Sequence, residues 1–190
     1  MTDITTFNAR RVAPEGTTTD PQGKPSTDTF AAYVDGSSLG NPGPAGWAVV
    51  LRERDTPAEP ITMRTVVGSA AHATNNAMEL EAATMALTSL PLDARGTVWC
   101  DAKYVVDGLN VWLPRWEVNG WKASRGKPVK NRPEWLTLAA LLRQRPGVRF
   151  QWMRGHSGKK YNALADTLAK TEAEKVQAGL SPVARLEFDQ

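Results

Sequence analysis

Three short runs of apolar and β-branched residues open the ordered part of the chain. They are residues 29–37, 45–54 and 61–70, and turn sequences containing Gly, Pro and Asp separate them. Alternation of this kind, broken by such turns, predicts three strands in an antiparallel meander. Residues 75–90 then carry apolar side chains three or four positions apart, and Pro91 follows. That spacing predicts a helix with one buried face.

The second half of the chain alternates between strands and helices. A short apolar strand is predicted at 96–101, helical segments with a break at Gly108 at 102–116, and a basic loop at 117–132. A helix at 133–145, a fifth strand at 147–154, a loop at 155–162 and a last helix at 163–178 complete the order. A meander followed by alternating elements predicts an α/β fold with a five-stranded mixed sheet, three antiparallel strands and then two parallel, flanked by helices.

The ends of the chain differ in composition from the middle. Residues 1–28 are rich in Thr, Pro, Gly and Asp, and their few large apolar side chains cannot offset the entropy of ordering. We therefore predict a disordered tail at 1–28, one domain at 29–178 and a short C-terminal tail at 179–190. With 190 residues and 41% hydrophobic residues, the chain is long enough for a sizeable core.

Cysteine content and hydropathy exclude several classes of protein. The single cysteine, Cys100, excludes an intramolecular disulfide framework and a cysteine-based zinc site. No apolar run is long enough to span a membrane, and the N-terminus lacks the apolar core of a secretory signal. We expect a cytoplasmic protein that does not associate with membranes.

Positive charge is concentrated in one part of the chain. Residues 1–102 hold 7 Lys or Arg and 12 Asp or Glu, residues 103–160 hold 13 and 3, and residues 161–190 hold 3 and 5. The middle block therefore carries a net charge of +10, although the whole chain carries only +3. Such a block is typical of polyanion binding, and it is also compatible with a solvated face.

Asp35 is a carboxylate inside an apolar strand. Burying it ionised costs several kcal/mol unless a partner or a metal compensates. Asp101 ends the fourth strand, and a parallel crossover would place that strand beside the first. Glu79 is expected in the first turn of the crossover helix, and Asp166 lies near the start of the last helix, after the loop that holds His156.

Four converging carboxylates require cations. At 4 Å and an effective dielectric near 20, each pair repels by about 4 kcal/mol. Oxygen ligands favour Mg²⁺ or Mn²⁺ over zinc, and two such ions about 4 Å apart are the usual arrangement for in-line displacement at phosphorus.

Each of these residues also has a purely structural interpretation. Glu79 could close a capping box with Asn76, and Asp101 could cap a helix that starts near Ala102. Asp166 could be an ordinary exposed helical acid, and His156 an ordinary loop histidine. Asp35 is the hardest to explain in this way.

Five motifs in this order resemble the ribonuclease H family, type 1. They are YVDGSSLGNPGPAGWAVVL, TNNAMELEAATMAL, CDAKYVVDGL, GWKASRGKPVKN and GHSGKKYNALADTLA, and they cover residues 30 to about 172. The resemblance implies an endoribonuclease that cleaves the RNA strand of RNA/DNA hybrids with Mg²⁺, leaving 3′-hydroxyl and 5′-phosphate ends.

The resemblance also assigns roles to residues. It implies that two Mg²⁺ ions, or Mn²⁺ as a substitute, are held by Asp35, Glu79, Asp101 and Asp166. One ion activates a water and the other stabilises the leaving 3′-oxygen, while His156 assists proton transfer or product departure. Asn41, Asn75 and Asn76 correspond to minor-groove contacts with the RNA strand.

Further residues correspond to those with which the family binds the DNA strand. Thr74, Ser124 and Asn131 resemble a phosphate pocket. A basic protrusion is implied by Trp112, Trp116 and Trp121, together with Arg115, Lys122, Arg125, Lys127 and Lys130. We expect the other tryptophans, Trp47, Trp99, Trp135 and Trp152, to lie in the core.

The sequence departs from the family pattern at three positions. Ala102 and Lys103 stand where a serine and a polar minor-groove contact are usual, and His72 stands where an arginine can bind phosphate. These departures concern substrate recognition and not the metal site. Two alternatives remain, a catalytically weak hybrid-binding module of the same fold and another nuclease of similar topology. We expect a monomer.

Overall fold

The structure of the protein is a computed structural model that describes residues 28–54, 59–155, 159–183 and 186–189. The predicted disordered tail, apart from Asp28, lies outside the described residues. In the described part of the chain, five strands and five α-helices follow one another in the predicted order. The strands are β1 Phe30–Ser38, β2 Gly43–Glu53, β3 Thr62–Ala73, β4 Gly96–Cys100 and β5 Val148–Trp152. The helices are α1 Asn75–Thr88, α2 Lys103–Asp107, α3 Leu113–Val118, α4 Arg132–Arg143 and α5 Lys160–Gln177, with a π-helical turn Gly108–Trp112 and a 3₁₀ turn Ser124–Gly126.

The sheet has the predicted mixed topology. Its order is β5-β4-β1-β2-β3-β6. β1, β2 and β3 form the antiparallel meander, and β4 and β5 add in parallel beside β1. The five-stranded core of the prediction is therefore confirmed, and a sixth strand extends it.

The sixth strand corrects the prediction of a C-terminal tail. Residues Leu186–Asp189 form β6 and pair antiparallel with β3. Val183 is also bonded to β3. Its carbonyl accepts from the N–H of Ser69 at 2.6 Å, and its own N–H donates to Oγ of Ser69 at 2.9 Å. An edge strand such as β3 presents unpaired backbone groups, and a short following segment can satisfy them without a strong pattern of its own.

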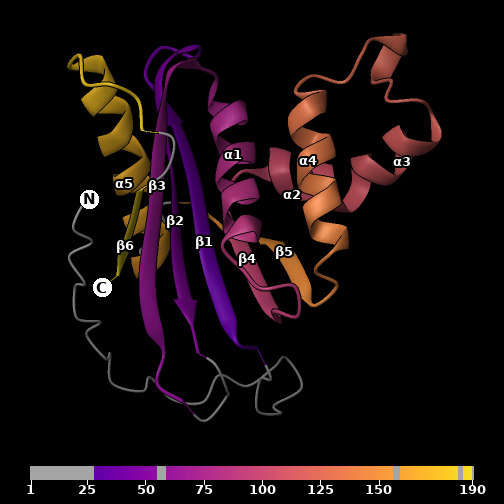
Figure 1. The fold of residues 1–190 in the computed structure, drawn as a ribbon. Coiled ribbons are helices and arrows are strands. Elements are labelled where there is room, and N and C mark those ends of the chain that lie inside the picture. The colour runs from indigo at the N-terminus through magenta and orange to yellow at the C-terminus, as the bar shows by residue number, and fades with distance from the viewer. Residues whose placement is uncertain (1–27, 55–58, 156–158, 184–185, 190) are drawn as a thin grey trace, which may run out of the picture.

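Helices cover the two faces of the sheet unequally. α5 packs on β1, β2 and β3 from one face, whereas α1 packs on β1 and β2 from the other, with α4 beside α1 (Figure 1). α2 lies between α1 and α4, and α3 with the loop that follows it extends beyond α4, at the side of the molecule away from α5 (Figure 1). The basic segment therefore projects from the α1 and α4 side.

The helical break predicted at Gly108 has a packing cause. The backbone changes there from α-helical to π-helical, and a Cβ at this position would lie 2.0 Å from the ring of Trp135. Glycine thus allows the turn to lie directly on a fully buried indole. Helix α4 carries that indole, so this contact joins the protruding segment to the core.

The tryptophan predictions are confirmed in part. Trp47 and Trp135 lie in the core, as expected. Trp99 is half-buried, and Trp152 is 45% exposed, so the prediction that it is a core residue was wrong. Trp152 is the last residue of the edge strand β5, and its indole N–H donates to the carbonyl of Asp101 at 3.0 Å.

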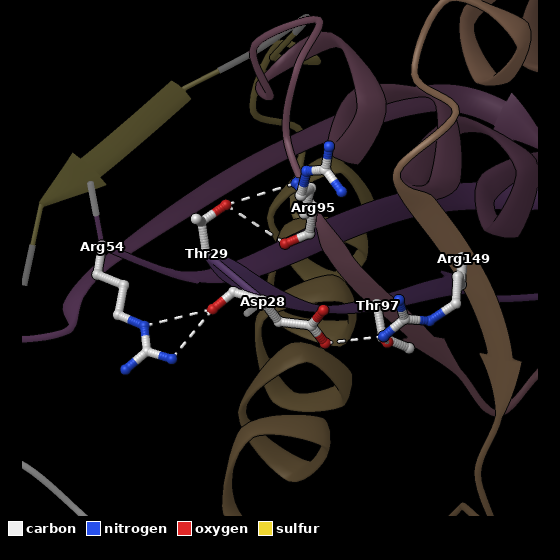
Figure 2. Close-up of polar contacts among 6 residues, drawn as sticks. All are labelled: Asp28, Thr29, Arg54, Arg95, Thr97 and Arg149. Carbon is white, nitrogen blue, oxygen red and sulfur yellow. Dashed lines mark hydrogen bonds and ion pairs between the residues drawn. The ribbon is translucent and has the colours of Figure 1, made fainter. Parts of the chain in front are cut away.

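Polar contacts tie the start of β1 across the sheet (Figure 2). The carbonyl of Asp28 accepts from Nε and Nη2 of Arg54 at 3.3 and 3.1 Å. Its carboxylate accepts from Arg149 at 2.8 Å, and the same guanidinium donates to Oγ1 of Thr97 at 3.1 Å. These bonds hold Asp28 between Arg54, the residue after β2, and Arg149 of β5.

None of the helices in the described part of the chain is long and apolar enough to cross a lipid bilayer.

Candidate active site

The register of two parallel strands brings two carboxylates together. β1 pairs with β4 up to Val34 and Cys100, where β4 ends. Asp35 and Asp101 are the next residues on each strand, so they lie side by side at the carboxyl end of the sheet. β1 continues to Ser38 without β4 beside it, which leaves this edge accessible to side chains from the helices.

A glycine allows α1 to bring a third carboxylate to the same edge. A Cβ on Gly36 would lie 2.4 Å from the backbone nitrogen of Glu79 and 2.5 Å from the carbonyl carbon of Met78. Since only glycine leaves room for this approach, α1 lies directly against β1 at the residue after Asp35. Glu79 is 4% exposed and Asp35 is 6% exposed.

The three carboxylates form a compact cluster. Asp35, Glu79 and Asp101 each offer an oxygen, and these oxygens lie within 4.8 Å of one another. Burial, followed by the charges of Asp101 and Asp166, raises the pKa of Asp35 from 3.8 to about 7. Burial and the charges of Asp35 and Asp101 raise the pKa of Glu79 well above its usual range. The cluster is therefore electrostatically strained, and a cation would relieve it.

Asp166 approaches the cluster from α5. It lies close enough for its charge to raise the pKa of Asp35. Its carboxylate also pairs with Nζ of Lys170, one helical turn later, at 2.8 Å. Three of the four predicted acids therefore form the cluster, and Asp166 lies near enough for its charge to act on Asp35.

Asn162 is a site residue that the sequence reasoning missed. Its Nδ2 donates to Oδ2 of Asp101 at 3.2 Å, and the side chain is 3% exposed. The bond restrains the carboxylate of Asp101 beside the cluster. Asn162 stands four residues before Asp166 on the same helix, so the i, i+4 spacing was the signal that could have identified it.

Cys100 contacts the cluster from the core side. Its Sγ lies 3.9 Å from Oε2 of Glu79 and 3.7 Å from the carbonyl of Ala102. Burial and the charge of Glu79 raise the pKa of this thiol well above its usual value. Cys100 is therefore a neutral, weak hydrogen-bond donor to the carboxylate.

The structure decides against two of the structural interpretations. Thr74 is the N-cap of α1 and accepts from the N–H of Ala77 at 3.3 Å, which places Glu79 in the second turn of the helix and not in a capping box. The N-cap of α2 is Ala102, without a side-chain cap bond, so Asp101 does not cap that helix. Both acids are free to serve the cluster.

His156 lies outside the described residues, which end at Gly155 and resume at Lys159. Gly155 itself approaches Asp101 closely, since a Cβ there would lie 2.6 Å from Oδ2 of that carboxylate. The segment that leads to His156 therefore starts beside the acidic cluster.

The predicted minor-groove residues meet where β1 and β2 are connected to the start of α1. Oδ1 of Asn41 accepts from the backbone N–H of Asn75 at 2.9 Å. Asn76 is exposed at the second position of α1, and the hydroxyl of Thr74 keeps its proton for donation. The structure thus brings Asn41 together with Thr74, Asn75 and Asn76 at the start of α1.

The predicted tryptophan-rich segment forms a continuous series of aromatic contacts. Trp112, Trp116 and Trp121 are half-buried, with ring centroids 5.8 and 6.0 Å apart in succession. Trp116 also meets the core residue Trp135 at 5.3 Å. The three rings therefore anchor the protruding segment and still expose part of their surface.

The polar residues of the same segment surround this aromatic series. Lys122, Ser124, Lys127 and Lys130 are exposed. The loop is closed by a β-bridge between Lys122 and Pro128. Asn131 has a left-handed backbone and its Nδ2 donates to the hydroxyl of Tyr104 at 3.2 Å. Thr74 caps α1, Ser124 lies in the 3₁₀ turn of the protruding loop and Asn131 is the N-cap residue of α4, so the three predicted phosphate-binding residues come from three separate segments.

The donor set of the acidic cluster fits a hard divalent cation. It consists of carboxylate oxygens alone, which is the chemistry that Mg²⁺ and Mn²⁺ prefer. Asp35 and Glu79 are buried beside like charges, and their raised pKa values record an electrostatic cost that a bound cation would remove.

Comparison with known proteins gives a consistent result. The family model described as RNase H matches residues 27–174. The chain is 42% identical over 153 residues to the ribonuclease H of Xanthomonas campestris pv. campestris, covering 80% of this chain and 97% of the relative. It is 43% identical over 142 residues to the ribonuclease HI of Xylella fastidiosa, covering 75% and 90%.

A solved structure agrees with the sequence comparisons. LC9-RNase H1, described as a type 1 RNase H with the type 2 active-site motif, superposes with a TM-score of 0.72 and 29% identity. The match covers 87% of this chain and 79% of that protein.

Proposed function

The chain belongs to the ribonuclease H family, type 1, and is a ribonuclease H enzyme, and from this premise we propose that it hydrolyses the RNA strand of RNA/DNA hybrids. The products would carry 3′-hydroxyl and 5′-phosphate ends. The observation that carries the proposal is the buried cluster of Asp35, Glu79 and Asp101, whose oxygens lie within 4.8 Å of one another.

Divalent metal would be held by the four acids. Asp35, Glu79 and Asp101 provide the buried oxygens, and Asp166 provides a ligand from the more exposed side, in exchange for its pairing with Lys170. Two Mg²⁺ ions, when bound, would activate a water for attack on the scissile phosphate and stabilise the leaving 3′-oxygen. Asn162 would hold Asp101 in one orientation.

Proton movement would depend on the loop after β5. His156 is proposed to assist proton transfer or product departure, since its usual pKa near 6.5 allows it to accept and release a proton near neutrality. The adjacent Gly155 lies against Asp101, which supports a position of this loop near the reacting phosphate.

Substrate recognition would involve both sides of the acidic cluster. Asn41, Asn75 and Asn76 meet at the start of α1 and offer amide groups that can bind 2′-hydroxyls in the minor groove. Thr74, Ser124 and Asn131 are proposed to bind a phosphate of the DNA strand. Trp112, Trp116 and Trp121 would pack against sugars, while Lys122, Lys127 and Lys130 neutralise phosphates.

The decisive experiment compares four substrates. Labelled RNA/DNA hybrid, RNA duplex, DNA duplex and single strands are each incubated with Mg²⁺ and with EDTA. We expect cleavage of the RNA strand of the hybrid in Mg²⁺ alone. An intact hybrid in Mg²⁺ would favour the catalytically weak binding module, and a cut DNA strand would contradict the assigned specificity.

Stabilisation by Mg²⁺ should depend on pH. The folded pKa of Asp35 is raised from 3.8 to about 7, so its protonated form favours the fold and this contribution is lost as the pH rises from about 4 to about 7. Mg²⁺ binds the deprotonated carboxylates and restores stability above that range. We expect Mg²⁺ to raise the Tm more at pH 8 than at pH 5, measured by calorimetry. An equal rise in Tm at pH 5 and at pH 8 would show that Asp35 is not a metal ligand.

Replacing Lys127 and Lys130 by alanine should weaken substrate binding. Both side chains are exposed on the loop after α3. Loss of two phosphate contacts should raise KM and reduce the dependence of log KM on log salt by about 1.8, with a similar kcat. Steady-state kinetics at several salt concentrations measure this. An unchanged salt dependence would show that these lysines are solvent-exposed residues that do not contact the substrate.

A further inference from the structure

The hydroxyl of Tyr104 lies between two side chains at the start of α4. Tyr104 is the second residue of α2, and its oxygen accepts from Nε1 of Trp135 at 3.0 Å and from Nδ2 of Asn131 at 3.2 Å. A tyrosine hydroxyl has two acceptor positions and one proton. Both acceptor positions are therefore occupied, while no acceptor among the described residues receives the proton.

Packing fixes the position of this hydroxyl. The ring of Tyr104 meets the ring of Trp135 edge-on, with centroids 5.3 Å apart, and the ring of Trp112 at 6.0 Å. Trp135 is fully buried against Gly108, so its indole cannot turn away. A buried indole N–H needs an acceptor, and Tyr104 provides it. The bond from Trp135 to Tyr104 is therefore a fixed part of the core.

The side chain of Asn131 is not used as a helix cap. An asparagine at the N-cap of a helix typically has an extended backbone, and its side-chain oxygen accepts from an N–H of the first turn. Asn131 is the N-cap residue of α4, but its backbone is left-handed, with a φ of 55°, and its side chain makes no cap bond. Such a backbone costs free energy and persists where surrounding contacts hold it, commonly at functional sites. The side-chain contact that holds Asn131 is the bond to Tyr104.

The second polar atom of the Asn131 amide is open to solvent. Its Oδ1 has no partner among the described residues, and it is not one of their buried unpaired atoms. A phosphate accepts hydrogen bonds, so it needs the Nδ2 end of the amide and not the Oδ1 end. Half a turn about the last side-chain bond exchanges the two ends, and this torsion is soft. Tyr104 suits the turned amide as well, because its unused proton can be donated to Oδ1.

The turned amide completes a directed series of hydrogen bonds. The N–H of Trp135 donates to the Tyr104 oxygen, and the Tyr104 hydroxyl then donates to Oδ1 of Asn131. Bonds in such a series polarise one another, which makes the outward Nδ2 of Asn131 a better donor to an anion. The core would thus determine which end of an exposed amide faces the substrate.

Tyr104 also connects this amide to the acidic cluster. It stands three residues after Asp101, and α2 begins between them at Lys103. Val105 and Val106, the next two residues of α2, are buried, so the helix cannot shift without disturbing the core. A phosphate bound by Asn131 would therefore lie at a fixed distance from the acids.

We propose that Tyr104 is a positioning residue for the phosphate of the DNA strand. Its hydroxyl donates to Oδ1 of Asn131 and thereby directs the N–H groups of that amide towards the phosphate. Tyr104 acts through Asn131 and does not touch the substrate itself. The inference rests on the proposed function, because that function assigns Asn131 to the phosphate-binding residues.

The first test measures binding of a labelled RNA/DNA hybrid in EDTA by fluorescence anisotropy. Asn131→Gly removes the amide and keeps the left-handed backbone without strain. It should weaken binding about tenfold, as expected for one hydrogen bond to a charged group. Tyr104→Phe removes only the hydroxyl and should weaken binding about fivefold. Neither variant removes a charge, so the dependence of affinity on salt should stay that of the wild type.

A double variant separates positioning from a general loss of stability. Tyr104→Phe leaves the N–H of Trp135 without an acceptor, so its Tm should fall for that reason alone. If Tyr104 acts through Asn131, the double variant Asn131→Gly, Tyr104→Phe should bind the hybrid no more weakly than Asn131→Gly. In Mg²⁺, Tyr104→Phe should raise KM and leave kcat similar. Losses of affinity that multiply in the double variant would overturn the inference.

Chemically altered substrates identify the phosphate. A series of hybrids carries one uncharged methylphosphonate at successive positions of the DNA strand. The wild type should lose affinity at the position that Asn131 contacts, and Asn131→Gly and Tyr104→Phe should both be insensitive at that same position. A Tyr104→Phe variant that keeps the wild-type sensitivity there would contradict the assigned role.

Tyr161→Phe is the matched control. It removes the hydroxyl of a tyrosine on α5 whose ring packs against Tyr33, and it should bind the hybrid as the wild type does. Wild-type affinity in Tyr104→Phe together with weak binding in Asn131→Gly would overturn the inference and keep the phosphate-binding residues. Wild-type affinity in both would overturn the assignment of Asn131 as well. Cleavage of the hybrid in Mg²⁺ is measured separately, so failure of the proposed activity is distinguishable from either result.

Discussion

Replacing Asp35 by asparagine is expected to abolish cleavage of the RNA strand and at the same time to stabilise the metal-free protein. The substitution keeps the shape of the side chain and removes one of the buried negative charges. Metal binding loses a central ligand, so turnover should fall by at least about a thousandfold, a size typical of removing an electrostatic element of catalysis. Cleavage assays on labelled hybrid measure this.

The stability of the same variant provides an independent measurement. A rise of the pKa of Asp35 from 3.8 to about 7 corresponds to about 4 kcal/mol of unfavourable interaction above pH 7. Part of this cost disappears in the Asp35→Asn variant, because the charge of Glu79 then has one fewer like-charged neighbour. We expect a higher Tm than the wild type at pH 8 in EDTA and a smaller response to Mg²⁺.

Measuring both cleavage and Tm shows whether Asp35 is a metal ligand or has a purely structural role. A variant that loses activity because it misfolds would have a lower Tm, and a variant that keeps near-normal turnover would remove Asp35 from the reaction. Thr65→Val is a matched control, since Thr65 is also a buried polar residue of the sheet but lies on β3, away from the acids. It should retain the wild-type response to Mg²⁺.

Replacing Gly36 by alanine should separate α1 from β1 and disable the site without touching an acid. The added Cβ would meet backbone atoms of Met78 and Glu79 at 2.5 and 2.4 Å, and backbone cannot rotate away as a side chain can. Overpacking of this kind should cost about 3 kcal/mol or more in unfolding free energy. Glu79 would move with the helix, so Mg²⁺ affinity and cleavage should both fall.

Gly179→Ala is the control for adding a methyl group to a glycine. Gly179 has a positive φ of 89° but no atom lies within 4 Å of the added Cβ. It should therefore cost only about 1 kcal/mol of backbone strain and leave Mg²⁺ affinity and activity unchanged. Chemical denaturation and titration calorimetry measure both quantities. Equal effects of the two substitutions would show that the approach of α1 to β1 is not what positions Glu79.

Much of the fold follows from local patterns in the sequence. The meander, the crossover helix and the parallel strands were predicted within a few residues of their observed bounds, because alternation and helical spacing report which side of an element is buried. β6 escaped prediction, since Leu186–Asp189 is short and weakly patterned and becomes a strand only because the edge of β3 offers partners. Trp152 was misplaced for a related reason, because its exposure depends on where the edge strand ends.

The candidate site was predictable as a set of acids but not as an arrangement. The sequence by itself determined that Asp35 is a buried carboxylate on a strand and that Glu79, Asp101 and Asp166 stand at positions from which they could join it, because these facts depend on residue type and periodicity. Only the tertiary structure decided that Gly36 lets α1 reach that strand and that Asn162 holds Asp101. Each of these depends on contacts between residues far apart in the chain, and local pattern carries no information about such distances.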